Sequence, residues 1–189
     1  KKEVVVEPDV NKRTKAGKEE YQKFLTLHEG MTILSHDEDE SLTGMRKKLT
    51  SSVEAMELLS GGIAEQVNVW NDPDSKIACK GKADYWNKDR NILVDIKTTQ
   101  DSSPEGFRKS AYKYGYDRQA SFYLDGFGVD QFWFIVIEKS APYNMAIYNC
   151  SEEFIDEGRM KYKRLLEMYS LYFIENLFDP YDHVYTGTL

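Results

Sequence analysis

Two carboxylates and one lysine lie in short segments whose residues alternate as those of strands do. Asp84 ends the first segment, and Asp95 and Lys97 follow in the next one. Because successive side chains of a strand point to opposite faces, Asp95 and Lys97 project from the same face. Carboxylates are hard oxygen ligands that suit Mg²⁺, and a neighbouring ammonium can orient or deprotonate a water or neutralise a phosphoryl oxygen. This set can therefore bind a divalent metal and activate water against a phosphodiester.

The surrounding residues favour a site over a simpler explanation. An isolated Asp-X-Lys on a strand is usually an exposed ion pair of little consequence. Here an apolar run precedes the acid and two threonines follow the lysine, so the polar residues gather at one tip of the strand. Asp84 completes the set if the two strands pair as a hairpin. Gly81 has no side chain, so backbone or substrate can approach closely there.

The elements that position these residues are predicted from periodicity and capping residues. Period-two segments predict strands at 4–7, 31–34, 65–70, 78–86, 92–98, 132–138 and 145–148. Helical spacing predicts helices at 14–27, as one helix from the acidic cluster 37–40 to Gly61-Gly62, at 104–112, at 117–124 and at 151–178. Thr14 and Ser151 are the expected N-caps, and Gly126 with Gly128 is expected to close the fourth helix. These elements predict a single α/β domain with a central mixed β-sheet flanked by helices.

Composition and charge limit the classes of protein. A chain of 189 residues suits one domain with a sizeable core. The longest apolar run, 132–137, is too short to span a bilayer and no leader segment opens the chain, which predicts no membrane partner and a cytoplasmic location. The net charge of −7 argues against a nucleic-acid partner. The region between 80 and 118 is nevertheless rich in cations: Lys80, Lys82, Lys88, Arg90, Lys97, Arg108, Lys109, Lys113 and Arg118.

Three motifs occur in order along the chain: Gly81-Lys82-Ala83-Asp84, then Val94-Asp95-Ile96-Lys97-Thr98-Thr99, then Gln119 with Tyr123. Together they resemble the PD-(D/E)XK nuclease superfamily, and most of all its phage-type RecE (exonuclease VIII) branch and the RecB-like relatives. The similarity covers roughly residues 60–170, and the run from Tyr114 to Tyr123 is typical of that branch. Asp-X-Lys alone is a weak signal, whereas three motifs in order are a strong one. The resemblance implies a restriction-endonuclease-like core.

The resemblance implies a metal site. Asp84 and Asp95 are expected to bind Mg²⁺ or Mn²⁺ through their side chains, and Ile96 through its carbonyl oxygen. Glu65 matches an acidic position that often precedes the metal-binding strand in relatives. The alternative for Glu65 is a solvated carboxylate at a strand end.

The resemblance also implies catalytic and DNA-binding roles. Lys97 is expected to be the catalytic lysine that acts on the attacking water. Gln119 and Tyr123 share one helix face and are expected beside the active site, where they position the scissile nucleotide or the lysine. The alternative for Tyr123 is a core aromatic residue with a satisfied hydroxyl. Three cations can grip phosphates, although each is of a kind that commonly lies solvated: Arg118, Lys113 and Lys109.

The activity implied by the resemblance is that of a phage-type, metal-dependent DNA exonuclease of recombination. Relatives digest duplex ends 5′ to 3′, pass the exposed strand to a single-strand annealing protein and often form homo-oligomeric rings in the host cytoplasm. The alternative is a non-catalytic nucleic-acid-binding or assembly module that retains the nuclease fold. A small-molecule enzyme has little support, because the chain lacks both a phosphate-cradling glycine loop and a nucleophile–histidine–acid set.

One feature of the relatives is expected to be missing. They usually carry a metal-ligating histidine on a helix upstream of the first motif, and neither His28 nor His36 has that context. The chain opens at Lys1 without an initiator methionine. We therefore expect the domain at 1–189 to lack an upstream N-terminal segment that carries this histidine. His28, with apolar helical neighbours, is expected to be structural.

Overall fold

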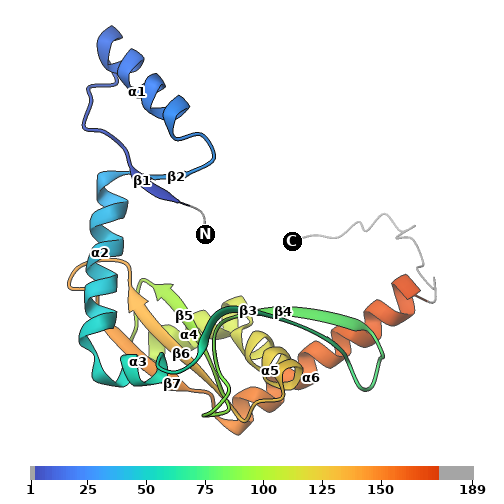
Figure 1. The fold of residues 1–189 in the computed structure, drawn as a ribbon. Coiled ribbons are helices and arrows are strands. Elements are labelled where there is room, and N and C mark those ends of the chain that lie inside the picture. Colours follow the sequence, from blue (N-terminus) through green and yellow to red (C-terminus); the bar gives the residue numbers. More distant parts are fainter. Residues whose placement is uncertain (1–2, 175–189) are drawn as a thin grey trace, which may run out of the picture.

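A mixed five-stranded β-sheet forms the centre of the computed structural model, which describes residues 3–174 (Figure 1). The strand order is β3-β4-β5-β6-β7, in which β5 and β6 are parallel and the other neighbours are antiparallel. The strands are β3 (Ile63–Asn71), β4 (Ala78–Asn87), β5 (Ile92–Thr99), β6 (Gln131–Glu138) and β7 (Met145–Asn149). The predicted α/β class with a central mixed sheet is confirmed.

Two helices form the crossover that the parallel pair requires. α4 (Pro104–Tyr114) begins with a proline, which needs no amide partner at the first position of a helix. Gly115, with a φ of 68°, ends α4 and precedes α5 (Tyr116–Phe127), because a left-handed residue there redirects the chain. α6 (Glu152–Tyr169) packs beside α5 (Figure 1). These helices cover one face of the sheet.

Two core clusters lie on opposite faces of β5. Leu93 belongs to the cluster that contains Ala120 of α5. Val94 belongs to the cluster that contains Ala55 of α3 (Val53–Leu58). The alternation predicted for this strand is therefore confirmed, because neighbouring residues of β5 enter different cores.

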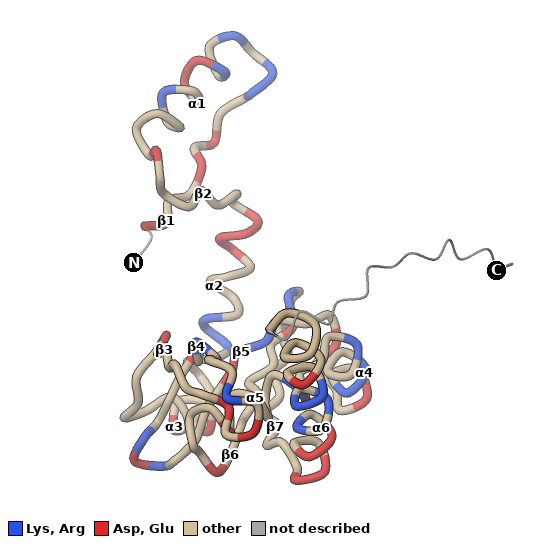
Figure 2. Tube along the Cα trace, turned by 90° about the vertical axis from the view of Figure 1, so that its right-hand side faces the viewer, with Lys and Arg blue, Asp and Glu red and all other residues tan. Residues whose placement is uncertain are grey.

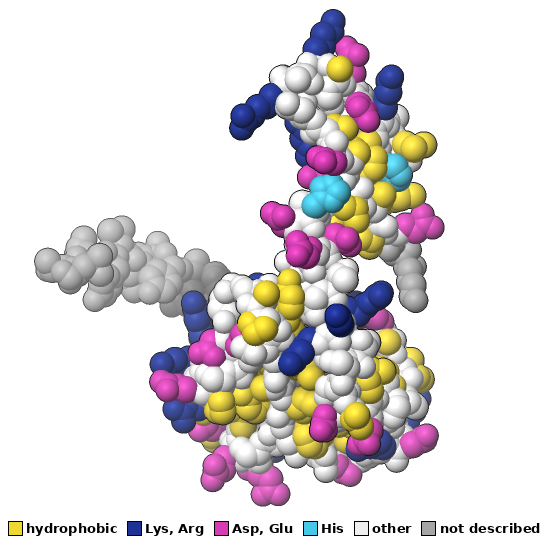
Figure 3. Space-filling view, turned by 90° about the vertical axis from the view of Figure 1, so that its left-hand side faces the viewer, with side chains coloured by type: hydrophobic (Ala, Val, Ile, Leu, Met, Phe, Trp, Pro, Cys, Tyr) yellow, Lys and Arg dark blue, Asp and Glu magenta, His cyan; other side chains and the backbone are white. Residues whose placement is uncertain are grey.

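A small N-terminal lobe, residues 3–34, stands away from the sheet (Figures 1 and 3). Thr14 caps its helix by accepting a hydrogen bond from the Gly17 amide at 3.0 Å, as predicted. α2 (His36–Ser51) joins this lobe to the sheet. The elements of the lobe are β1 (Val4–Val6), α1 (Lys15–Leu27) and β2 (Thr32–Leu34), with β1 and β2 paired in parallel.

One predicted helix is in fact two. The single helix expected between the acidic cluster and the glycine pair is wrong, because Ser52 has extended backbone angles, φ −89° and ψ 121°. Its side chain accepts a hydrogen bond from the Ala55 amide at 3.2 Å and thereby starts α3. The acidic cluster 37–40 also lies within α2 and does not precede it, since Ser35 caps that helix.

Two other helix ends differ from the prediction. Gly126 lies inside α5, and Gly128, with a φ of 65°, is the C-cap. The missing side chain at Gly126 makes room for Trp70, because a Cβ there would lie 2.3 Å from the indole ring. The helix predicted at 151–178 runs as α6 to Tyr169 and continues as a π-helix (Ser170–Ile174), and residues 175–178 lie outside the described residues.

Within residues 3–174, no helix is both long and apolar enough to cross a bilayer.

Ion pairs and one close contact hold α5 against α6. Near the start of α5, the buried carboxylate of Asp117 pairs with Lys161. Near its end, Asp125 accepts a hydrogen bond from Arg159 at 2.9 Å. Gly158 lets the helices approach between these pairs, because a Cβ at that position would lie 2.0 Å from the Asp117 carbonyl oxygen. The position of α5 over the sheet is therefore fixed by α6.

Gly158→Val is expected to lower the free energy of unfolding by about 3 kcal/mol, the upper range for overpacking a close contact. Urea denaturation followed by circular dichroism measures this change. The matched control is Met160→Val on the same helix, where the native side chain is 69 % exposed and the expected change stays within about 0.5 kcal/mol. Equal stability of the two variants would contradict the close α5–α6 contact.

Candidate metal centre

β4 and β5 separate at Asp84. Their antiparallel ladder ends at the pair Tyr85–Val94. The Asp84 side chain then reaches β5, where its Oδ2 accepts a hydrogen bond from the Ile96 N–H at 3.1 Å. The carboxylate thus satisfies a backbone donor that the departing strand leaves behind. This contact places Asp84 at the edge of β5, as the hairpin prediction requires.

The regular alternation of side chains along β4 is interrupted at Asp84. Ala83 packs in the core beneath α5, whereas Tyr85 packs against the opposite core, although residues two apart on a regular strand share a face. On the neighbouring strand β3, the register places Glu65 opposite Asp84, and Glu65 has a left-handed φ of 56°. Both strands of the hairpin therefore bend at this level. The bend presents the Asp84 carboxylate to β5.

Asp95 is buried beside two polar partners. Its side chain is 6 % exposed, and its Oδ1 accepts a hydrogen bond from Gln119 Nε2 at 2.5 Å. Lys97 Nζ lies 2.7 Å from Oδ2 as an ion pair, but Oδ2 accepts no hydrogen bond of good geometry. Burial raises the pKa of the Asp95 carboxyl, the Lys97 ammonium opposes this rise, and the Asp84 carboxylate adds to it. A cation at Oδ2 would stabilise the ionised form.

The Ile96 carbonyl oxygen faces the same edge of β5. In a strand, the N–H and C=O of one residue point to the same side, and the Ile96 N–H points to Asp84. The Asp84 carboxylate and the Ile96 carbonyl therefore lie on the same side of β5, and Asp84 is near enough to Asp95 to raise its pKa. An all-oxygen set of this kind suits Mg²⁺, which usually keeps several waters beside one or two carboxylates. Within residues 3–174, no group of three or more His, Cys, Asp or Glu side chains could hold a metal ion, so the carbonyl and water would complete the shell.

The Lys97 ammonium is held over aromatic rings. Its Nζ lies 4.7 Å from the Tyr116 ring centroid and 5.9 Å from that of Phe134. The side chain is only 18 % exposed, so these contacts and Asp95 fix the position of the charge. Sequence reasoning did not single out Tyr116 as a site residue, although it lies in the recognised run from Tyr114 to Tyr123. Its role depends on the packing of α5 over β5.

The two residues predicted to share a face of α5 both lie over the sheet. Gln119 contacts Asp95 directly. Tyr123 covers Gly81, where an added Cβ would lie 3.0 Å from its ring. A side-chain ring therefore approaches Gly81 closely, whereas backbone or substrate was expected there. Tyr123 also packs against the core, with its ring centroid 6.0 Å from that of Phe127, which agrees with the core position of the alternative interpretation.

The remaining predicted residues lie outside the centre. The Glu65 carboxylate accepts a hydrogen bond from Lys82 in an exposed ion pair, so the structure does not bring it to Asp95. Lys109 pairs with Glu105 along α4 at 2.8 Å. Figure 2 shows cations interspersed with acids on α4 and α6. The other two predicted DNA-binding cations are also peripheral, Lys113 over the Tyr114 ring and Arg118 against Gly115.

Neither described histidine belongs to the centre. Figure 3 shows both histidines (cyan) on the arm formed by the N-terminal lobe and α2. His28 Nδ1 lies 2.9 Å from the Phe24 carbonyl oxygen, and its ring centroid lies 4.3 Å from that of Phe24. These contacts agree with the structural role expected for His28.

Comparisons with known proteins identify the fold. A sequence model of the family described as "PDDEXK-like domain of unknown function (DUF3799)" matches residues 6–174. No curated protein matches the chain. A solved structure of a candidate exonuclease from Eubacterium rectale is similar with a TM-score of 0.60 and 12% identity, covering 94% of this chain and 73% of that one. This likeness shows a shared fold.

Two further solved structures are more distant. A phage-related exonuclease from Haemophilus somnus 129PT has a TM-score of 0.45 and 15% identity, covering 86% of this chain and 85% of that one. An alkaline exonuclease from Laribacter hongkongensis has a TM-score of 0.36 and 15% identity, and the match covers 87% of each chain.

Mn²⁺ is expected to stabilise the native chain against heat. At about 100 times the dissociation constant, binding contributes about 2.7 kcal/mol, which raises the unfolding midpoint by about 5–10 °C at this chain length. Differential scanning fluorimetry measures the shift. Asp84→Asn keeps an acceptor for Ile96 but removes a ligand charge, so its shift should largely disappear. The control Asp89→Asn alters an exposed carboxylate and should keep it; equal shifts in both variants would place the ion elsewhere.

Proposed function

Since this chain belongs to the family of PDDEXK-like domains (DUF3799), we propose that it is a metal-dependent nuclease that hydrolyses phosphodiester bonds of DNA. One observation carries the proposal. The Asp84 carboxylate contacts the backbone of β5 at Ile96, and the preceding residue of β5, Asp95, is buried with the Lys97 ammonium 2.7 Å away. The motif order of the sequence and the fold shared with the candidate exonuclease from Eubacterium rectale support the same function.

Each residue of the candidate centre has a separate role in this proposal. A bound Mg²⁺ or Mn²⁺ would polarise the phosphoryl group and lower the pKa of the attacking water. Lys97 orients that water and neutralises negative charge that develops on the phosphoryl oxygens. Gln119 fixes Oδ1 of Asp95, so that Oδ2 would be the oxygen that binds the metal. The Ile96 amide fixes one oxygen of Asp84 in the same way. The reaction passes through no covalent intermediate.

The finer features of the proposal come from the family resemblance. We propose exonuclease action on duplex DNA ends in recombination, with 5′ to 3′ polarity. A single-strand annealing protein would receive the exposed strand, and a homo-oligomeric ring would keep the enzyme on DNA. Digestion of linear but not covalently closed circular duplex would support the exonuclease assignment, and equal digestion of both would overturn it.

A second candidate function has one observation in its favour. The charges of the centre are partly satisfied without a metal, because Asp84 accepts from the Ile96 amide and Asp95 pairs with Lys97. This arrangement would also suit a non-catalytic DNA-binding or assembly module. The thermal response to Mn²⁺ separates the candidates, since such a module would show none.

Lys97→Ala is expected to lower Mg²⁺-dependent digestion of linear duplex DNA by at least about 100-fold, the lower range for losing a group that acts on the attacking water. A fluorescent end-labelled duplex followed over time measures the rate. Lys88→Ala removes the same charge from the β4–β5 turn and should digest at the native rate. Circular dichroism checks that both variants are folded. Digestion by Lys97→Ala at the rate of Lys88→Ala would refute the role of the lysine.

Gln119→Leu is expected to lower the affinity of the chain for Mn²⁺ by about 10–100-fold, as is typical for a group that orients a metal ligand. The Mn²⁺ concentration that gives half-maximal digestion should rise, because Asp95 loses the partner that fixes its carboxylate. Tyr123→Phe keeps the ring over Gly81 and serves as the comparison on the same helix face. The positioning role of Gln119 fails if its variant needs no more Mn²⁺ than the native chain.

A further inference from the structure

A concave site lies beside the candidate metal centre. It is a cavity of about 180 Å³ at the carboxyl ends of the parallel strands β5 and β6, the place where open α/β sheets usually bind ligands. Lys97 lines this cavity and also contacts Asp95, so the cavity and the metal centre are contiguous. Its lining includes Thr98, Thr99, Ser110, Tyr114, Tyr116 and Lys139.

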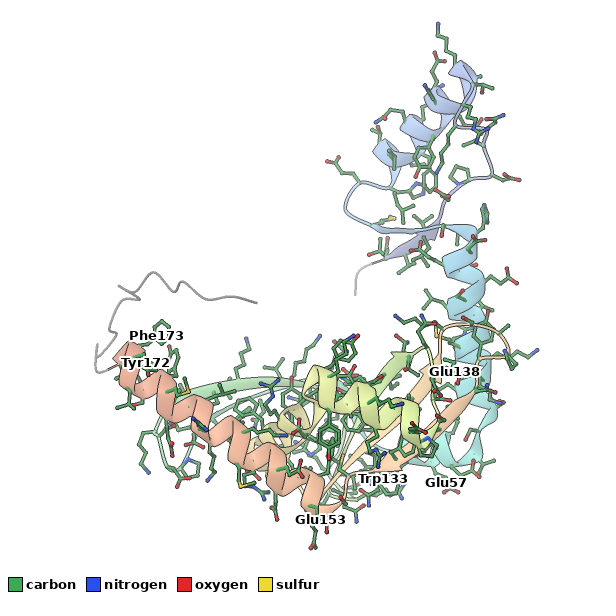
Figure 4. All side chains as sticks on the ribbon, turned by 180° about the vertical axis from the view of Figure 1, so that it is seen from behind. Glu57, Trp133, Glu138, Glu153, Tyr172 and Phe173 are labelled. Atoms are coloured by element: carbon green, nitrogen blue, oxygen red, sulfur yellow. The ribbon has the colours of Figure 1, made fainter. Side chains whose placement is uncertain are left out.

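The cavity contains a second lysine in a fixed backbone position. Lys139 follows β6 directly, and its amide donates to the Thr99 carbonyl oxygen at 2.9 Å. The neighbouring Glu138, at the end of β6 beside α2 (Figure 4), accepts hydrogen bonds from Ser102 N at 2.9 Å and Ser102 Oγ at 3.0 Å. That carboxylate is therefore engaged with the loop before α4. Among the described residues, the Lys139 ammonium forms no ion pair.

The one carboxylate in the lining is held by its own loop. Asp101 Oδ1 accepts a hydrogen bond from the Ser103 amide at 2.9 Å. Its other oxygen lies over Gly106, where an added Cβ would be 2.2 Å away. The negative charge therefore rests on the first turn of α4, which favours it. Lys97 is paired with Asp95, so Lys139 supplies the positive charge of the lining that has no ion-pair partner among the described residues.

The size of the cavity bears on which part of a nucleic acid it can take. A volume of about 180 Å³ is ample for a phosphate group. Tyr114 lies at the cavity and is 59 % exposed, with its ring stacked on Tyr116 at 5.8 Å between centroids. Exposed aromatic rings of this kind are platforms on which bases stack.

We propose that this cavity binds the phosphodiester next to the scissile one, with Lys139 contacting the phosphate and Tyr114 contacting the adjoining base. Both are positioning residues, since neither reaches the reacting atoms. The proposal rests on the proposed function, because the shared Lys97 defines which phosphodiester is adjacent. It extends the DNA-binding surface to the end of β6, beside Tyr114, whose ring the predicted cation Lys113 also contacts.

Equilibrium binding without metal tests the proposal apart from catalysis. A fluorescein-labelled duplex oligonucleotide is titrated in EDTA at several salt concentrations. Lys139→Ala should weaken binding about 10-fold and should reduce the slope of log K against log[salt] by about 0.7–0.9, the value for one lost phosphate contact. The control Lys88→Ala lies at the other end of β5 and should keep the native slope. Tyr114→Ala should weaken binding about 10-fold without changing the slope, whereas Tyr114→Phe should bind as the native chain does.

The outcomes separate this inference from the nuclease proposal. If Lys139→Ala keeps the native affinity and salt slope while Lys97→Ala loses digestion, the cavity has no such role and the nuclease proposal stands. If Lys139→Ala loses affinity and slope but no variant or native chain digests DNA, the binding site stands and the nuclease proposal fails. Absence of DNA binding by the native chain overturns the inference.

Discussion

The burial of the Asp95 carboxylate is the interaction on which the rest of the site depends. An ionised carboxylate in a protein interior is costly unless it is paired and hydrogen-bonded. Here Gln119 satisfies one oxygen and Lys97 lies beside the other. Both partners must be held in place, because removing either would leave a buried charge with too few contacts. Because Asp95 Oδ2 accepts no hydrogen bond of good geometry, a divalent cation beside it would be a favourable addition.

The helices α5 and α6 hold the partners of Asp95 in place. Gln119 reaches Asp95 only because α5 is fixed over β5, and α5 is fixed by α6 through the close contact at Gly158. Tyr116, at the start of α5, supports the Lys97 ammonium from the same helix. The departure of β4 from β5 adds the last element, since it frees the Ile96 amide and brings Asp84 to the edge. The geometry of the site therefore depends on the packing of the whole domain.

Much of this arrangement could be predicted from the sequence, and the failures have physical causes. Alternation correctly assigned the two faces of β5, because each face enters its own core. The break at Ser52 was missed because the apolar stripe continues across it, while one serine cap decides the backbone. Glu65 pairs with Lys82 because the register of β3 with β4 brings the two residues close, and the motifs of the sequence do not show that register. Lys139 comes beside Lys97 only through the parallel pairing of β5 with β6, a tertiary contact.

The central claim is that two carboxylates and one backbone carbonyl form a single divalent-metal site beside Lys97. An anomalous difference map from a crystal soaked in Mn²⁺ tests it most directly. We expect one strong peak within coordination distance of the Asp84 and Asp95 carboxylates and the Ile96 carbonyl oxygen. A saturating soak with no peak at this edge of β5, or with the ion bound by other residues, would contradict the claim.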